Sequence, residues 1–106
     1  MSYRFMRTLV MFDLPTETNS DRRHYRQFRR FLLREGFVMM QESIYTKICI
    51  NAHMVDKVAV AIDAHKPPKG IVQVLSVTER QFINMKLITG QLVNNYIQTE
   101  QRLVVI

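Results

Sequence analysis

Apolar residues occupy both faces of an alternating pattern in residues 4–13. One face carries Phe5, Leu9 and Met11, and the other carries Met6, Thr8, Val10 and Phe12. A strand that is apolar on both faces is typical of the centre of a sheet with both faces covered. Proline cannot donate to the sheet ladder, so Leu14-Pro15 ends the strand. The pattern predicts a central strand that is followed by a polar loop over 16–20.

Residues 21–35 carry the clearest helical pattern. At about 100° per residue, the apolar positions Tyr25, Phe28, Phe31 and Leu32 share an arc of roughly 120°. Six arginines share a second arc of roughly 140° on the opposite side, namely Arg22, Arg23, Arg26, Arg29, Arg30 and Arg34. Gly36 is placed to end the helix in a left-handed cap. We therefore expect an amphipathic helix with a basic outer face.

The following segments complete a recognisable element order. Residues 37–50 are rich in strand formers and predict two strands, with a reversal between Glu42 and Lys47. A second helix is expected over 51–65, a loop over 66–70 and a strand over 71–77. The order βαββαβ predicts an α+β, ferredoxin-like sandwich with two helices on one face of the sheet.

More chain follows than this unit needs. Ile83, Met85 and Leu87 alternate with polar residues, and 103–106 is apolar. We expect extra C-terminal strands that cover the second sheet face or pair with another chain at an open edge. We interpret residues 1–106 as one domain and expect a homodimer. Residues 79–106 are expected to make dimer or partner contacts.

Composition narrows the functional classes. The 106 residues are 47% hydrophobic, and no apolar run reaches the ~18 residues of a membrane span. The amino terminus lacks signal-peptide features, the one cysteine, Cys49, excludes an intrachain disulfide, and no Cys/His cluster has zinc-finger spacing. We therefore expect a cytoplasmic protein without a structural metal. Cys49 is expected to be a small buried hydrophobe. Phosphate-binding glycine loops and protease motifs are absent, while a net charge of +6 favours anionic partners.

Asp13 is the candidate catalytic acid. It follows the apolar residues 9–12 at the carboxyl end of the expected central strand. The structural alternative is that its carboxylate bonds backbone amides in the turn into Leu14-Pro15. A two-fold axis near this strand end would bring two copies of Asp13 together. Two carboxylates with waters and a substrate phosphate would suit magnesium.

The arginine arc is the second candidate site. A solvated helix surface is the structural alternative, but like charges four residues apart destabilise a helix. Arg22, Arg26 and Arg30 belong to such a series, and the acids of the helix are only Asp21 and Glu35. We interpret the arc as a nucleic-acid-binding surface, although arginine also suits a partner's carboxylates.

These residues together resemble a known family. The series Val10-Met-Phe-Asp13-Leu-Pro15, Arg22-Arg23, Phe28, Leu32, Gly36 and Gln41-Glu-Ser43-Ile-Tyr45 is similar to the CRISPR-associated Cas2 family. The later Thr78-Glu-Arg-Gln81-Phe and Met85 are similar to the variant that accompanies type II systems. The resemblance covers nearly the whole chain.

The resemblance implies a ferredoxin-like homodimer with Asp13 of each protomer at the interface. It implies an endonuclease dependent on Mg²⁺ or another divalent cation, acting on single-stranded RNA or double-stranded DNA during spacer acquisition. Asp13 is the catalytic and metal-binding position, Arg22 and Arg23 match the family's basic pair, and Ser43 matches a strand serine near the dimer cleft. Arg26, Arg29 and Arg30 rest on the charge argument alone.

Two other functions remain open at this point. One is a non-catalytic, DNA-binding homodimeric scaffold for the adaptation integrase, which would dock on residues 103–106. The other is a regulatory domain for a small ligand, because the ferredoxin-like fold hosts many functions. The missing glycine-rich ligand loop and the arginine excess count against the ligand-binding domain.

Overall fold

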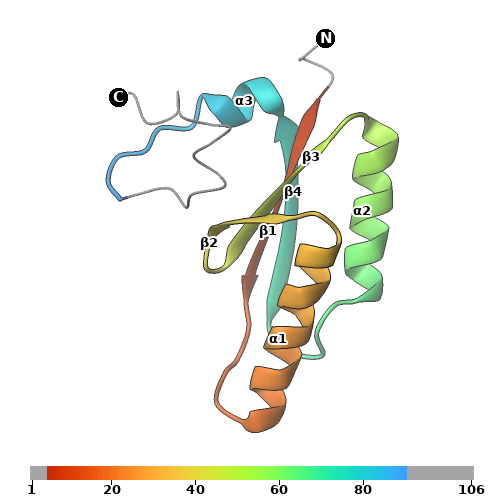
Figure 1. Ribbon diagram of the computed structural model, residues 1–106, viewed down its shortest axis with the longest axis vertical. Helices are drawn as coiled ribbons and strands as arrows, with labels where there is room; N and C mark the ends of the chain where they lie inside the picture. The colour runs from red at the N-terminus through yellow and green to blue at the C-terminus, as the bar shows by residue number, and fades with distance from the viewer. Residues whose placement is uncertain (1–4, 91–106) are drawn as a thin grey trace.

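The central strand organises the fold in the computed structural model, which describes residues 5–90 (Figure 1). The elements are β1 Met6–Asp13, α1 Asn19–Arg34, β2 Val38–Gln41, β3 Ile44–Cys49, α2 Ala52–Ala64, β4 Ile71–Thr78 and α3 Glu79–Ile83. The strands form one sheet in the order β2-β3-β1-β4, and all neighbouring strands are antiparallel. The βαββαβ order and this strand order confirm the predicted ferredoxin-like fold.

Side-chain and backbone caps define both ends of α1. Thr18 is the N-cap, and its hydroxyl accepts from the backbone N–H of Asp21 at 3.0 Å. The Asp21 carboxylate accepts in return from the Thr18 N–H at 3.3 Å, which completes a capping box. At the other end Gly36 has φ +93°, and Phe37 N–H donates to Leu32 O at 3.0 Å. This is the left-handed cap that the glycine predicted.

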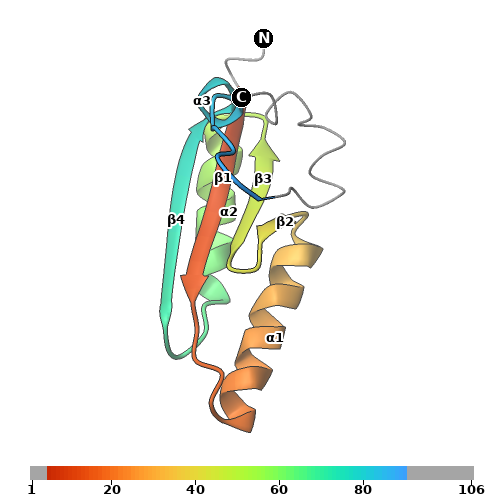
Figure 2. The same ribbon diagram turned by 90° about the vertical axis from the view of Figure 1, so that its left-hand side faces the viewer.

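The two sheet faces have different cover. The helix-facing side holds the main core, in which Phe12 contacts Phe28 and Tyr45 at ring-centroid distances of 5.4 and 5.7 Å. Figures 1 and 2 show α1 and α2 on this side of the sheet. On the opposite side a smaller cluster joins Leu9, Met40 and Phe82. Phe82 lies in α3, so α3 covers part of the second face.

The cover of the second sheet face differs from the sequence prediction. The alternation of Ile83, Met85 and Leu87 does not form a strand, because α3 occupies Glu79–Ile83 and no strand is assigned over 84–90. Thr78 caps α3 by accepting from Gln81 N–H at 3.0 Å, while the Gln81 side chain accepts from Thr78 N–H at 2.9 Å. The capping box stabilises the first turn of a helix, so the chain enters α3 here and not the strand that the apolar alternation predicted. The expected apolar strand at 103–106 lies outside the described residues.

The other element predictions are confirmed with small shifts at their ends. The reversal between the second and third strands falls at Glu42-Ser43, inside the predicted window. Asn51 caps α2 by accepting from Met54 N–H at 2.8 Å. Cys49 is fully buried, as expected of a small hydrophobe.

Candidate functional site

Asp13 is the last residue of β1 and is exposed. Side chains alternate along a strand, and Val10 and Phe12 point into the core under the helices. The Asp13 side chain therefore belongs to the opposite face, together with Met11. In the register of β4, Asp13 faces Ile71 and Met11 faces Gln73. The carboxylate stands at the edge of the sheet face that α1 and α2 leave free.

Close backbone packing fixes the position of this strand end. Gly70 has φ +93°, and a Cβ placed on it would lie 2.6 Å from the Asp13 carbonyl oxygen. Any residue with a Cβ would fit here only if one of the two backbone segments moved, so the position requires glycine. On the other side of β1, Phe12 N–H donates to Ser43 O at 3.0 Å. The structure thus brings the turn containing Ser43 beside the end of β1, and Ser43 itself is exposed.

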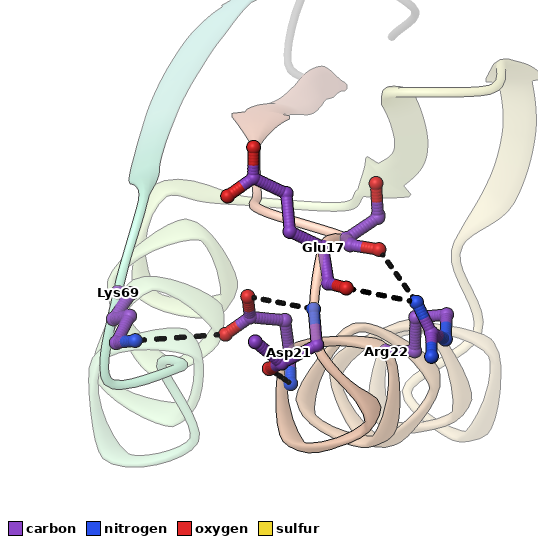
Figure 3. Close-up of polar contacts among 6 residues, drawn as sticks. Glu17, Asp21, Arg22 and Lys69 are labelled. Carbon is purple, nitrogen blue, oxygen red and sulfur yellow. Dashed lines mark hydrogen bonds and ion pairs between the residues drawn. The ribbon is translucent and has the colours of Figure 1, made fainter.

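Arg22 is engaged by the loop between β1 and α1. Its Nη1 donates to the carbonyl oxygens of Thr16 at 3.0 Å and Glu17 at 3.2 Å, and its Nη2 donates to Asn19 Oδ1 (Figure 3). The Glu17 carboxylate points away from these contacts. Arg22 therefore organises the loop that follows Asp13, and its role in nucleic-acid binding stays a prediction.

Asp21 is the buried acid of this loop, with 7% of its surface exposed. Burial acts to raise its pKa, but hydrogen bonds from the backbone and side chain of Thr18 to the carboxylate and an ion pair with Lys69 at 3.7 Å act in the other direction (Figure 3). The net result is a pKa below the ordinary value of 3.8. The ionised carboxylate therefore stabilises the folded start of α1.

This lowered pKa predicts a pH-dependent effect of Asp21→Asn. A depressed carboxyl pKa adds stability above the unfolded-state value, and that stability is lost as the pH falls through the folded-state value. We expect the variant to be less stable than wild type at pH 7 and the difference to shrink below about pH 4. Urea unfolding at both pH values measures it. A difference that stays constant with pH would contradict this assignment.

The remaining predicted arginines divide into two groups. Arg29 Nε donates to the hydroxyl of fully buried Tyr45 at 2.9 Å and so ties α1 to the sheet. Arg23, Arg26 and Arg30 are exposed and make no hydrogen bond or ion pair with any other residue in 5–90. The latter three carry charge that is available to a ligand.

The ion pair on the second sheet face was not predictable from the sequence pattern. Arg7, only 4% exposed, donates from Nε and Nη2 to the Glu79 carboxylate at 2.9 and 2.6 Å. Its guanidinium also lies 4.2 Å from the ring centroid of Phe82. The one local signal was a charged residue inside an apolar strand, and its partner is 72 positions away. This pair joins β1 to α3.

A single chain does not assemble a metal centre within the described residues. Over 5–90, no three His, Cys, Asp or Glu side chains lie close enough to share a metal ion. Asp13 offers the hard oxygen donor that Mg²⁺ prefers, so it suits the ion chemically but needs further ligands. Over the same range, no helix combines the length and apolar character needed to cross a membrane.

Comparison with known proteins gives one consistent family. The model of the family described as CRISPR associated protein Cas2 matches residues 6–85. A protein of Treponema denticola named CRISPR-associated endoribonuclease Cas2 is 43% identical over 95% of this chain and 100% of its own. A protein of the same name from Ligilactobacillus salivarius is 36% identical over 95% of this chain and 100% of its own. Another, from Lacticaseibacillus rhamnosus, is 47% identical over 80% of this chain and 84% of its own. The chain belongs to the CRISPR-associated Cas2 family.

Proposed function

We propose that the chain is an endonuclease of CRISPR adaptation that works as a homodimer, with Asp13 from both protomers holding a divalent metal, Mg²⁺ first among them. Single-stranded RNA is the first substrate to test, because its relatives are named endoribonucleases. Double-stranded DNA is the second. The observation that carries the proposal is an exposed carboxylate at the end of the central strand, on a sheet face with apolar residues left in solvent.

The proposed dimer would cover that face. Leu75 and Ile71 are 51% and 56% exposed. They sit opposite Leu9 and Asp13 in the register of β1 and β4, so they share the face with Asp13. A second copy packed here by a two-fold axis would bury these apolar side chains and bring two Asp13 carboxylates into one cleft.

The chain's own residues would bind and orient the substrate. Two Asp13 carboxylates would supply the negative oxygen ligands of the metal, and Gly70 and Ser43 would hold the strand end in place through their backbone contacts. A bound divalent metal would offset charge on a phosphodiester and activate a water. Arg23, Arg26 and Arg30 would bind the substrate backbone from α1, because their guanidinium groups are exposed and have no partner in 5–90.

Metal removal tests the enzyme directly. We expect labelled single-stranded RNA or duplex DNA to be cut with Mg²⁺ and to stay intact with an excess of chelator. Without the metal, the negative Asp13 carboxylates would repel the negative phosphate of the substrate. Electrophoresis of both substrates, with and without metal restored, identifies the preferred one. Equal cutting with and without chelator would reject the metal-dependent mechanism.

The dimer face is tested by Leu75→Glu. An unpaired carboxylate on a buried apolar surface should weaken self-association by about 100-fold or more and remove cleavage with it. Light scattering after gel filtration measures the mass of the assembly. Val60→Glu is the matched control, because Val60 is 69% exposed on α2, on the helix side of the sheet. A dimeric Leu75→Glu protein would place the interface elsewhere.

A second candidate is the non-catalytic scaffold for the adaptation integrase. One observation favours it: α1 carries a row of exposed arginines that make no hydrogen bond or ion pair with another residue of 5–90. Under this hypothesis Arg23, Arg26 and Arg30 bind DNA, and the integrase docks on residues 103–106. Loss of the complex on truncation after Glu100, with Asp13→Ala still supporting spacer acquisition, would select the scaffold.

A further inference from the structure

A cationic cleft of about 360 Å³ lies between α1 and the loop that follows α2. Figure 1 shows that loop running past α1 on its way to β4. The basic and imidazole side chains that line the cleft are His24, Arg30, Arg34, His65 and Lys66. Phe28 and Phe31 also line it but are 2% and 3% exposed, and no acidic side chain of residues 5–90 is among its lining residues. The cleft therefore combines positive charge with the exposed ring of His65.

The cations of the cleft are free to bind a ligand. Arg30 and Arg34 are exposed and make no hydrogen bond or ion pair with another residue of the described range. Lys66 pairs with Asp63 at 3.1 Å, but both side chains are largely exposed. An exposed pair of this kind contributes little stability, so Lys66 can exchange Asp63 for another anion at small cost.

His65 is held in one orientation over Phe31. Its ring stacks on Phe31 with centroids 4.1 Å apart and planes 11° apart. Its Nδ1 lies 2.9 Å from Ala61 O, and a carbonyl oxygen only accepts, so Nδ1 donates. Phe31 is 3% exposed while His65 is exposed, so the imidazole covers Phe31 and turns its other face to solvent. A planar group can stack on that outer face.

We propose that this cleft binds one nucleotide unit of a single-stranded nucleic acid. Arg30, Arg34 and Lys66 take the phosphate, and the base stacks on the outer face of His65. A cationic groove beside an aromatic platform is the usual way in which proteins hold single strands without reading sequence. An acidic peptide would use the same cations but has no planar group for His65.

The cleft is separate from the Asp13 site. It lies on the side of the sheet that carries α1 and α2, whereas Asp13 belongs to the opposite face. The inference rests on the proposed function only for the class of ligand. A nucleic acid held here would lie on the outer, helical surface of the protein, where Arg30 is also one of the three arginines proposed to bind the substrate backbone.

Binding of a fluorescein-labelled oligouridine, followed by fluorescence anisotropy in the presence of chelator, tests the cleft without cleavage. Arg34→Gln should weaken binding several-fold and reduce the slope of log affinity against log salt by about 0.7, the loss of one phosphate contact on a single strand. His65→Ala should weaken binding by about 5-fold or more and leave the slope unchanged, because it removes stacking and not a phosphate contact. Arg34→Lys should recover part of the affinity.

Lys57→Gln is the matched control for charge. Lys57 is exposed on α2 and does not line the cleft, so its loss should change affinity less than 2-fold. Unfolding midpoints show that each variant is folded. Uridine monophosphate should compete more strongly than inorganic phosphate, because only the nucleotide supplies a base.

Three results would overturn the proposal. The first is an Arg34→Gln effect no larger than that of Lys57→Gln. The second is unchanged binding by His65→Ala, which would indicate diffuse charge attraction without a nucleotide pocket. The third is equal competition by a polyglutamate peptide of matched charge, which would indicate an acidic protein partner. The binding assay contains chelator and does not depend on cleavage. A wild-type protein that cleaves nothing when Mg²⁺ is present would therefore reject the proposed enzyme and leave this test intact.

Discussion

Replacing Asp13 by asparagine is expected to lower the cleavage rate by at least about 100-fold, the scale of groups that act at the reacting centre. Asparagine keeps the shape of the side chain and one acceptor oxygen but removes the negative charge that Mg²⁺ prefers. In the proposed dimer one substitution removes both carboxylates. A gel-based time course at saturating Mg²⁺ and RNA measures the loss.

The fold should not suffer from this change. Asp13 is exposed, no hydrogen bond or ion pair of its side chain occurs within the described chain, and its strand contacts are made by the backbone. The unfolding midpoint and the dimer mass should match wild type. Asp56→Asn removes an exposed acid from α2 and should keep full activity. Wild-type cleavage by the Asp13→Asn protein would show that this carboxylate is not catalytic.

The largest effect on stability is expected from Glu79→Ala. The substitution removes the carboxylate that accepts from two nitrogens of Arg7, whose side chain is 5% exposed. Breaking a buried ion pair from one side costs about 3–5 kcal/mol, because the remaining charge stays buried. The second sheet face should loosen, since α3 is joined to β1 through this pair and through Phe82. Urea unfolding monitored by circular dichroism measures the difference.

Two further variants separate the ion pair from general damage to α3. Arg80→Ala changes the next, exposed residue and should alter the free energy of unfolding by less than about 0.5 kcal/mol. The double variant Arg7→Met with Glu79→Ala removes both charges and should be more stable than Glu79→Ala alone. A double variant that is less stable than Glu79→Ala would show that the buried charge is not the source of the loss.

The main fold could be predicted because its signals are local or periodic. Apolar residues on both faces of residues 4–13 placed β1 at the centre, where β3 and β4 now flank it. Gly36 and Asn51 marked helix ends through caps that involve only a few neighbouring residues. The alternation of Ile83, Met85 and Leu87 predicted a strand and gave no indication of α3, although Thr78 and Gln81 match a capping box.

The site was only partly predictable, because side-chain partners depend on the folded chain. Periodicity placed all six arginines on one arc, but it could not show that Arg22 binds loop carbonyls or that Arg29 bonds Tyr45. It also could not show that His65, from the end of α2, stacks on Phe31 of α1 beside Arg34. Asp13 was predictable as a strand-end carboxylate, whereas the backbone contact of Gly70 that fixes it was not.

One active site is expected to need Asp13 from two protomers, and mixing two kinds of protomer shows directly whether it does. Wild-type and Asp13→Asn chains are mixed in equal amounts, allowed to exchange subunits, and assayed for cleavage of the preferred substrate at constant total protein. If both carboxylates are needed, only pure wild-type dimers are active, and the mixture retains about one quarter of the wild-type activity. Retention of about one half would show that each protomer acts alone and would contradict the shared site.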